Sequence, residues 1–158
     1  MGRGTIALAA AAVTLLLPGC GGSDDPGVTT STISKETFVR KVDAICEESN
    51  ERVQARFSAY LKGKENLRKA IKHPSKADYE VLIVKTLVPS IEREIREIRA
   101  LGAPSGDEDR VGEMLTALEE GTEVAEDDPA AVTASSDAIF GIFSRLAGEY
   151  GLEACGSR

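Results

Sequence analysis

The residues of this chain with the clearest covalent chemistry are its three cysteines, Cys20, Cys46 and Cys155. A cysteine thiol can carry a lipid, bind a metal or form a disulfide, and its sequence context favours one of these outcomes. No pair of cysteines has the C-x-x-C spacing that is typical of redox motifs. Cys20 alone stands at the end of an apolar segment, so its chemistry is considered first.

Cys20 closes the stretch Leu17-Pro18-Gly19-Cys20, directly after an uncharged and mainly apolar run over residues 5–17. A basic residue, Arg3, precedes this run, which is shorter than the ~20 residues that a membrane span requires. The arrangement resembles a bacterial lipobox, in which the cysteine receives a diacylglycerol and the signal peptide is cut off before it. We therefore expect a lipoprotein signal peptide over residues 1–19 and lipid attachment at Cys20.

Lipid on Cys20 would place the rest of the chain on the outer face of the cell membrane. Two acyl chains anchor a protein stably, whereas a single chain holds it only marginally. The alternative is an ordinary secretory signal with an incidental cysteine. No A-x-A-like cleavage site follows the apolar run, which disfavours that alternative.

Assigning Cys20 to lipid leaves Cys46 and Cys155 as an even pair in an oxidising compartment. We expect a disulfide between them. On the chain-entropy model, closing so long a loop stabilises a fold by up to ~4.7 kcal/mol. Two free thiols or a redox pair are the alternatives.

Asp43 and Asn50 flank Cys46 at spacings of three and four residues, which places all three on one face of a helix. One interpretation is a small polar pocket beside the disulfide. The other is that Asp43 and Asn50 accept or donate hydrogen bonds to the backbone of the C-terminal tail, residues 151–157. The second is favoured because buried polar groups need partners and an irregular tail offers them.

The sequence predicts no catalytic residue, no metal ligand set and no cofactor. The single histidine, His73, precedes Pro74 among lysines, which is typical of a solvated surface residue. Di-iron bundles need Glu-x-x-His on two helices, and one histidine with two methionines also disfavours haem or copper. No nucleophile elbow, zinc-protease, P-loop or dinucleotide-binding motif occurs.

The chain is acidic, with a formal net charge of −7, which disfavours nucleic acid as a partner. Basic residues gather over residues 62–76 and acidic residues over residues 107–128. These two regions could compensate each other across the surface. The alternative is that residues 62–76 dock an anionic polymer of the cell envelope.

Residues 20–33 are rich in Gly, Ser, Thr and Asp and predict a flexible tether, so the folded domain should span residues 34–158. Apolar residues at three- and four-residue spacing predict helices over residues 34–62, 75–101, 109–126 and 129–150. Ser34, Ser75 and Asp128 are the expected N-caps. Pro89 predicts a kink in the second helix, and the charged run from Glu92 to Arg99 an exposed outer face. Gly121 falls near the apolar stripe of the third helix, where it would allow a close approach.

Four amphipathic helices joined by short loops predict an all-α, up-down four-helix bundle. In that topology the end of the fourth helix lies beside the start of the first. Cys46 lies in the first half of helix one and Cys155 just beyond helix four, so the topology brings the two cysteines to the same end. The predicted fold and the predicted disulfide therefore support each other.

The chain resembles small actinobacterial lipoproteins of uncharacterised function. The resemblance is carried by the lipobox, the segment from Phe38 through Cys46 to Asn50, the helix stop Leu101-Gly102-Ala103-Pro104, and Tyr150-Gly151-Leu152-x-x-Cys155-Gly156. It implies a helical domain with paired cysteines on the outer leaflet, and it offers no activity or active-site residues to transfer to this chain. Two hypotheses follow: a non-enzymatic interaction module that docks to an envelope protein or polymer, or a ligand-binding lipoprotein with an apolar cavity between its helices.

Overall fold

The computed structural model describes residues 33–62 and 75–157, all within the unit Ser31–Arg158. The expected signal peptide, Cys20, most of the expected tether, His73 and nearly all of the basic region lie outside the described residues. No strand occurs among the residues described, which confirms the all-α fold. The helices are α1 (Lys35–Lys62), α3 (Lys76–Tyr79), η1 (Glu80–Leu87), α4 (Val88–Leu101), α5 (Glu108–Asp127), α6 (Pro129–Ala134), α7 (Ser136–Tyr150) and α8 (Glu153–Gly156).

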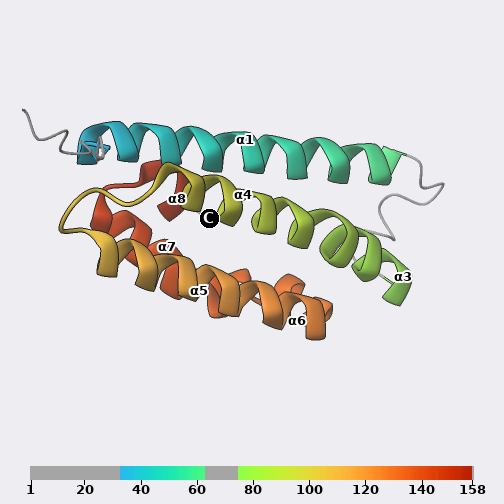
Figure 1. Cartoon of the computed structure of the whole chain (residues 1–158). Coiled ribbons are helices and arrows are strands. Elements are labelled where there is room, and N and C mark those ends of the chain that lie inside the picture. Colours follow the sequence, from blue (N-terminus) through green and yellow to red (C-terminus); the bar gives the residue numbers. More distant parts are fainter. Residues whose placement is uncertain (1–32, 63–74, 158) are drawn as a thin grey trace, which may run out of the picture. The chain divides into compact units, whose positions relative to one another are not determined.

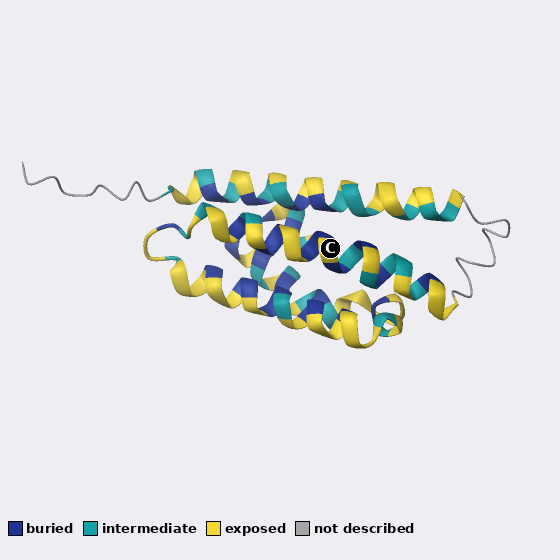
Figure 2. Ribbon diagram, turned by 45° about the vertical axis from the view of Figure 1, so that its right-hand side comes forward, coloured by how far each residue is buried: buried dark blue, intermediate teal, exposed yellow. Residues whose placement is uncertain are grey.

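The long helices follow one another up and down (Figure 1). α1 packs on α4, α4 on α5, and α5 on α7, as an up-down bundle requires. Buried residues line the faces that the helices turn toward one another, and exposed residues cover the outside (Figure 2). None of the described helices is both long and apolar enough to cross a membrane.

Local hydrogen bonds begin the helices where the sequence predicts. Ser34 Oγ accepts the backbone N–H of Thr37 at 3.3 Å at the start of α1. Ser75 and Asp78 form a reciprocal capping box at the start of α3. Asp128 caps α6 by accepting the N–H of Ala131 at 3.4 Å, with Pro129 at the first helical position.

The irregularity expected around Pro89 takes the form of a π-helix, η1, which ends just before it. The N–H of Val88 donates to the carbonyl of Ile83, five residues back, so the helix is wider here than an α-helix. The hydroxyl of Thr86 donates to the carbonyl of Val81 at 2.8 Å. Pro89 has no N–H to donate, and its ring would clash with the preceding turn of a regular α-helix. The widened turn before Pro89 accommodates the proline.

The expected single helix over residues 129–150 is wrong, because the chain breaks it into α6 and α7 at Ser135. Ser135 adopts an extended conformation, with φ −161° and ψ 94°, and its hydroxyl accepts the N–H of Ala138 at 3.2 Å. A second N-cap inside the segment therefore starts a new helix. The Ser-Ser pair at 135–136 was the sequence signal for this cap.

Glycine lets α5 and α7 approach closely, as the sequence predicts. A Cβ atom at Gly121 would lie 2.7 Å from Phe140 Cδ1 and 3.0 Å from the Ile139 carbonyl oxygen. No side chain fits at that position without moving α7.

The C-terminal helix α8 packs against both α1 and α7 and fills the seam between them. Gly151 ends α7 with φ +101°, and the buried Leu152 turns back into the core. Gly156 rests on α7, where an added Cβ would lie 3.0 Å from the backbone nitrogen of Gly148. The first and last long helices are therefore joined at this end largely through the tail.

Candidate functional site

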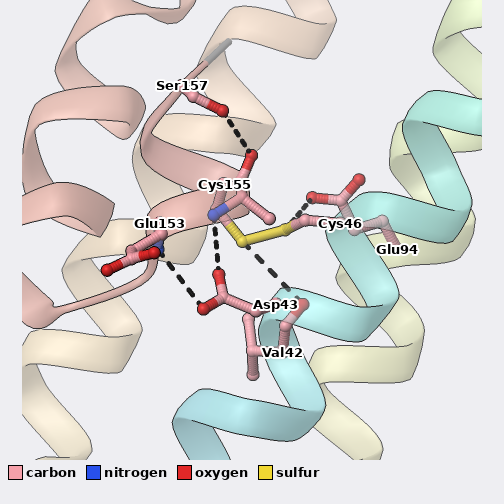
Figure 3. The surroundings of a disulfide bond; sticks show 8 residues. Val42, Asp43, Cys46, Glu94, Glu153, Cys155 and Ser157 are labelled. Atoms are coloured by element: carbon pink, nitrogen blue, oxygen red, sulfur yellow. Dashed lines mark hydrogen bonds between the residues drawn. A yellow bond between two sulfur atoms is a disulfide. The ribbon is translucent and has the colours of Figure 1, made fainter.

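The disulfide between Cys46 and Cys155 is the centre of the α1–α8 contact (Figure 3). The Cα atoms of the two residues are 5.4 Å apart, and both side chains are completely buried. The structure thus makes the pairing that the sequence predicts. The bond ties the C-terminal tail to the middle of the first helix.

Asp43 holds the tail one turn away from the disulfide. Its carboxylate accepts the backbone N–H of Glu153 at 3.3 Å and that of Ala154 at 2.9 Å. Dashed lines in Figure 3 run from Asp43 to the tail. The residue at the N-cap position of α8, Leu152, has no side-chain acceptor of its own. Asp43 therefore supplies the cap of α8 from another helix. This agrees with the interpretation that Asp43 hydrogen-bonds to the backbone of the C-terminal tail.

Among the described residues Asn50 makes no hydrogen bond to the tail, so only Asp43 follows the interpretation that both residues bond to it, and a polar pocket shared by the two stays a prediction. The two residues lie seven positions apart on α1, which is two turns or ~10 Å along the axis. Asn50 instead lines a groove farther along α1. Both residues were expected to bond to the tail because they share a helical face, but Asn50 lies two turns farther along α1 than the residue that does so, Asp43.

Glu94 was expected on the exposed outer face of α4, and that expectation is wrong. Its side chain is completely buried, and its Oε1 lies 3.3 Å from Cys46 Sγ. Glu94 follows Ile91 by three residues and precedes Ile98 by four, so it falls on the edge of the apolar stripe. That spacing was the signal that sequence reasoning missed.

Cys46, Glu94 and Cys155 form a compact buried cluster, with one potential ligand atom from each within 4.8 Å of the others. Metal binding by cysteine requires thiolates, and the disulfide has none to offer. A disulfide sulfur also carries no hydrogen, so Glu94 makes a close polar contact with it and accepts no thiol proton. In this oxidised state the cluster is a structural link between α1 and α8.

The groove that contains Asn50 has a volume of about 230 Å³ and lies between α1, the junction of η1 with α4, and the α6–α7 break. Its lining residues are Ser49, Asn50, Val53, Gln54, Leu87, Ile91, Val132, Ser136 and Phe140. Apolar side chains predominate, and the polar ones are uncharged. The arrangement can bind an apolar molecule and hydrogen-bond a neutral group on it.

Another polar cluster joins three segments at the start of α1. The Tyr150 hydroxyl donates to Asp107 Oδ2 at 2.8 Å, and Lys35 Nζ lies 3.4 Å from the same oxygen. These contacts, led by the hydrogen bond from Tyr150, hold the pKa of Asp107 below its usual value. Burial and the bond to Asp107 raise the pKa of Tyr150. Lys35 also lies 4.2 Å from the centre of the Tyr150 ring, so the cluster fastens helix ends together.

Two of the acidic residues over 107–128 form ion pairs with basic residues of other helices. Besides the pair of Lys35 with Asp107, Glu119 of α5 pairs with Arg99 of α4 at 2.7 Å. The expected compensation of their negative charge by the basic residues over 62–76 lies mostly outside the described residues. The pairs that are seen tie neighbouring helices to one another.

Comparison of the chain with family models, with curated proteins and with solved structures gave no match. The assignment of a function therefore rests on the sequence motifs and on the geometry described above.

Proposed function

We propose that this protein is a lipid-anchored, non-enzymatic binding module on the outer face of the cell membrane. The observation that carries the proposal is the buried disulfide between Cys46 and Cys155. Structural disulfides persist in oxidising compartments and are rare in the cytosol. Together with the lipobox at Cys20, the disulfide supports a chain that is exported and then held at the membrane by a diacylglycerol.

Three buried or half-buried carboxylates, those of Asp43, Asp78 and Asp107, have structural partners. Asp43 caps α8, and Asp78 joins the capping box of α3 and accepts the Tyr60 hydroxyl at 2.6 Å. Asp107 binds Tyr150 and Lys35. Each of these carboxylates fastens one segment to another, as a structural role requires.

The groove beside Asn50 favours the hypothesis of a ligand-binding lipoprotein, in which the protein binds a small molecule between its helices. Apolar hollows with a few polar groups are the usual form of ligand sites, which span ~300–1,000 Å³. At about 230 Å³, this groove lies just below that range and suits a slender ligand.

The anchor is tested by replacing Cys20 with Ala in cells that export the protein. We expect the wild-type chain in the membrane fraction and the Cys20→Ala chain in the soluble extracytoplasmic fraction. Cys155→Ala is the matched control, because it removes a cysteine without touching the lipobox and should stay with the membrane. Retention of the Cys20→Ala chain in the membrane would rule out lipid anchoring.

A further inference from the structure

The groove between α1, the η1–α4 junction and the α6–α7 break has no ionisable side chain in its lining. Two other hollows of the domain have charged side chains in their linings. A hollow of about 470 Å³ between α4 and α5 is lined by Glu92, Arg96 and Arg99 among others, and one of about 560 Å³ between η1 and α6 includes Lys76 and Glu80. In an acidic chain with 28% charged residues, an uncharged hollow selects an uncharged ligand.

Both departures from regular helix border this groove. Leu87, which lines it, is the last residue of the π-helix η1. Ser136, on the opposite wall, is the first residue of α7 after the break at Ser135. π-helical turns occur frequently at functional sites, and local irregularity is expected where a site is built at some cost to the fold. The end of η1 and the start of α7 therefore both border the groove, and η1 also lines the charged hollow through Glu80 and Val84.

The groove continues the seam that the tail fills. α8 occupies the space between α1 and α7 beside Cys46 and Gly148. The groove begins one turn farther along α1, at Ser49, and lies beside Phe140 of α7. The tail of the chain thus fills one end of the seam, and the groove lies beyond it.

The volume of the groove limits the size of the ligand that it can bind. At about 230 Å³ the groove lies below the range of ordinary small-molecule sites, so it suits a slender ligand such as a single extended alkyl chain. The hydroxyl of Ser136 and the side-chain amides of Asn50 and Gln54 can bind a neutral head group. An anionic head would lose its hydration without gaining a cation, in a protein that is itself negative.

We propose that this groove binds the alkyl chain of a single-chain, uncharged lipid drawn from the membrane, with its hydroxyl head group at Asn50 and Gln54. The inference deepens the proposed binding function by naming the ligand class. It rests on the proposed function, but binding to the groove is tested on the chain without its anchor, so the two can fail separately.

The test uses the oxidised full chain with Cys20→Ala, purified without detergent, and 1-decanol as the probe. We expect 1-decanol to shift the side-chain amide signals of Asn50 and Gln54 saturably in nuclear magnetic resonance spectra. Decanoate, which has a chain of the same length and a charged head, should bind about tenfold or more weakly.

Two variants locate the site. Val53→Phe fills the groove from its half-exposed wall and should weaken 1-decanol binding about tenfold or more, whereas Val124→Phe, on an exposed position of α5, should leave it unchanged. Asn50→Asp adds a charge without a change of size and should also weaken binding, so a folding defect in the first variant does not end the test. The proposal is overturned if 1-decanol gives no saturable shift, if decanoate binds equally well, or if neither groove variant weakens binding.

Discussion

The carboxylate of Asp43 on α1 accepts the backbone N–H of Ala154 on α8 at 2.9 Å, across 111 positions of sequence. This bond and the disulfide one turn away fasten the same short helix to the same face of α1. The tail is therefore held by one covalent and one polar attachment. The uncharged groove begins one turn farther along α1, at Ser49.

Removing the carboxylate of Asp43 should destabilise the domain. Asp43→Ala leaves the first N–H groups of α8 without their acceptor, and the loss of a helix cap costs ~0.5–2 kcal/mol. The measurement is the free energy of unfolding from denaturant titration of the oxidised protein. Glu47→Ala changes an exposed acid on the same helix and serves as the control. Equal stability of the two variants would show that the bond contributes nothing.

Removing the disulfide should have a larger effect. Replacing Cys46 and Cys155 together by Ala gives the unfolded chain more conformations. Loss of such a disulfide lowers the free energy of unfolding by ~2–5 kcal/mol. Thermal unfolding of the two forms measures the difference. In the wild-type chain, denatured without reductant, we expect neither cysteine to react with a thiol reagent. Titration of both thiols would mean that the bond is absent.

Two glycines on α5 should respond in opposite directions to the same substitution. Gly121→Ala places a methyl group against Phe140 and should destabilise the domain by ~1–3 kcal/mol. Gly112→Ala meets nothing within 4 Å and should stabilise it by up to ~1 kcal/mol through helix propensity. Unfolding free energies of both variants give the comparison. A stabilising effect of Gly121→Ala would contradict the close packing of α5 on α7.

The cluster of Lys35, Asp107 and Tyr150 should make stability depend on pH at both extremes. The pKa of Asp107 is lowered by the bond from Tyr150, so its contribution is full above the unfolded value of ~3.9 and is lost as pH falls through the folded pKa. The pKa of Tyr150 is raised by burial and by Asp107, so its contribution is full below ~10 and is lost as pH rises through the folded pKa.

Tyr150→Phe tests this directly. Because the variant loses the hydroxyl that donates to Asp107, the pKa of Asp107 should rise toward its usual value. Carboxyl chemical shifts followed through an acid titration measure that pKa. Tyr79→Phe removes a hydroxyl far from the cluster along the chain and should leave the titration of Asp107 unchanged. An unchanged Asp107 pKa in Tyr150→Phe would remove the basis for the pH dependence.

The sequence by itself determined the features that depend on near neighbours. Ser34, Ser75 and Asp128 cap their helices through N–H groups three residues away, so their identity and spacing suffice to place the helix starts. Four amphipathic segments with short loops likewise sufficed to predict the up-down order, since each stripe has to face the same core.

Only the tertiary structure decided what depends on distant segments. Glu94 is buried because α1 and the disulfide cover the edge of its stripe, and Asp43 bonds to the tail because the single turn of α8 lies beside it. The break at Ser135 and the π-helix before Pro89 bound a groove that belongs to no single helix. A helical period tells which residues share a face, but what covers that face is set by packing between segments far apart in the chain.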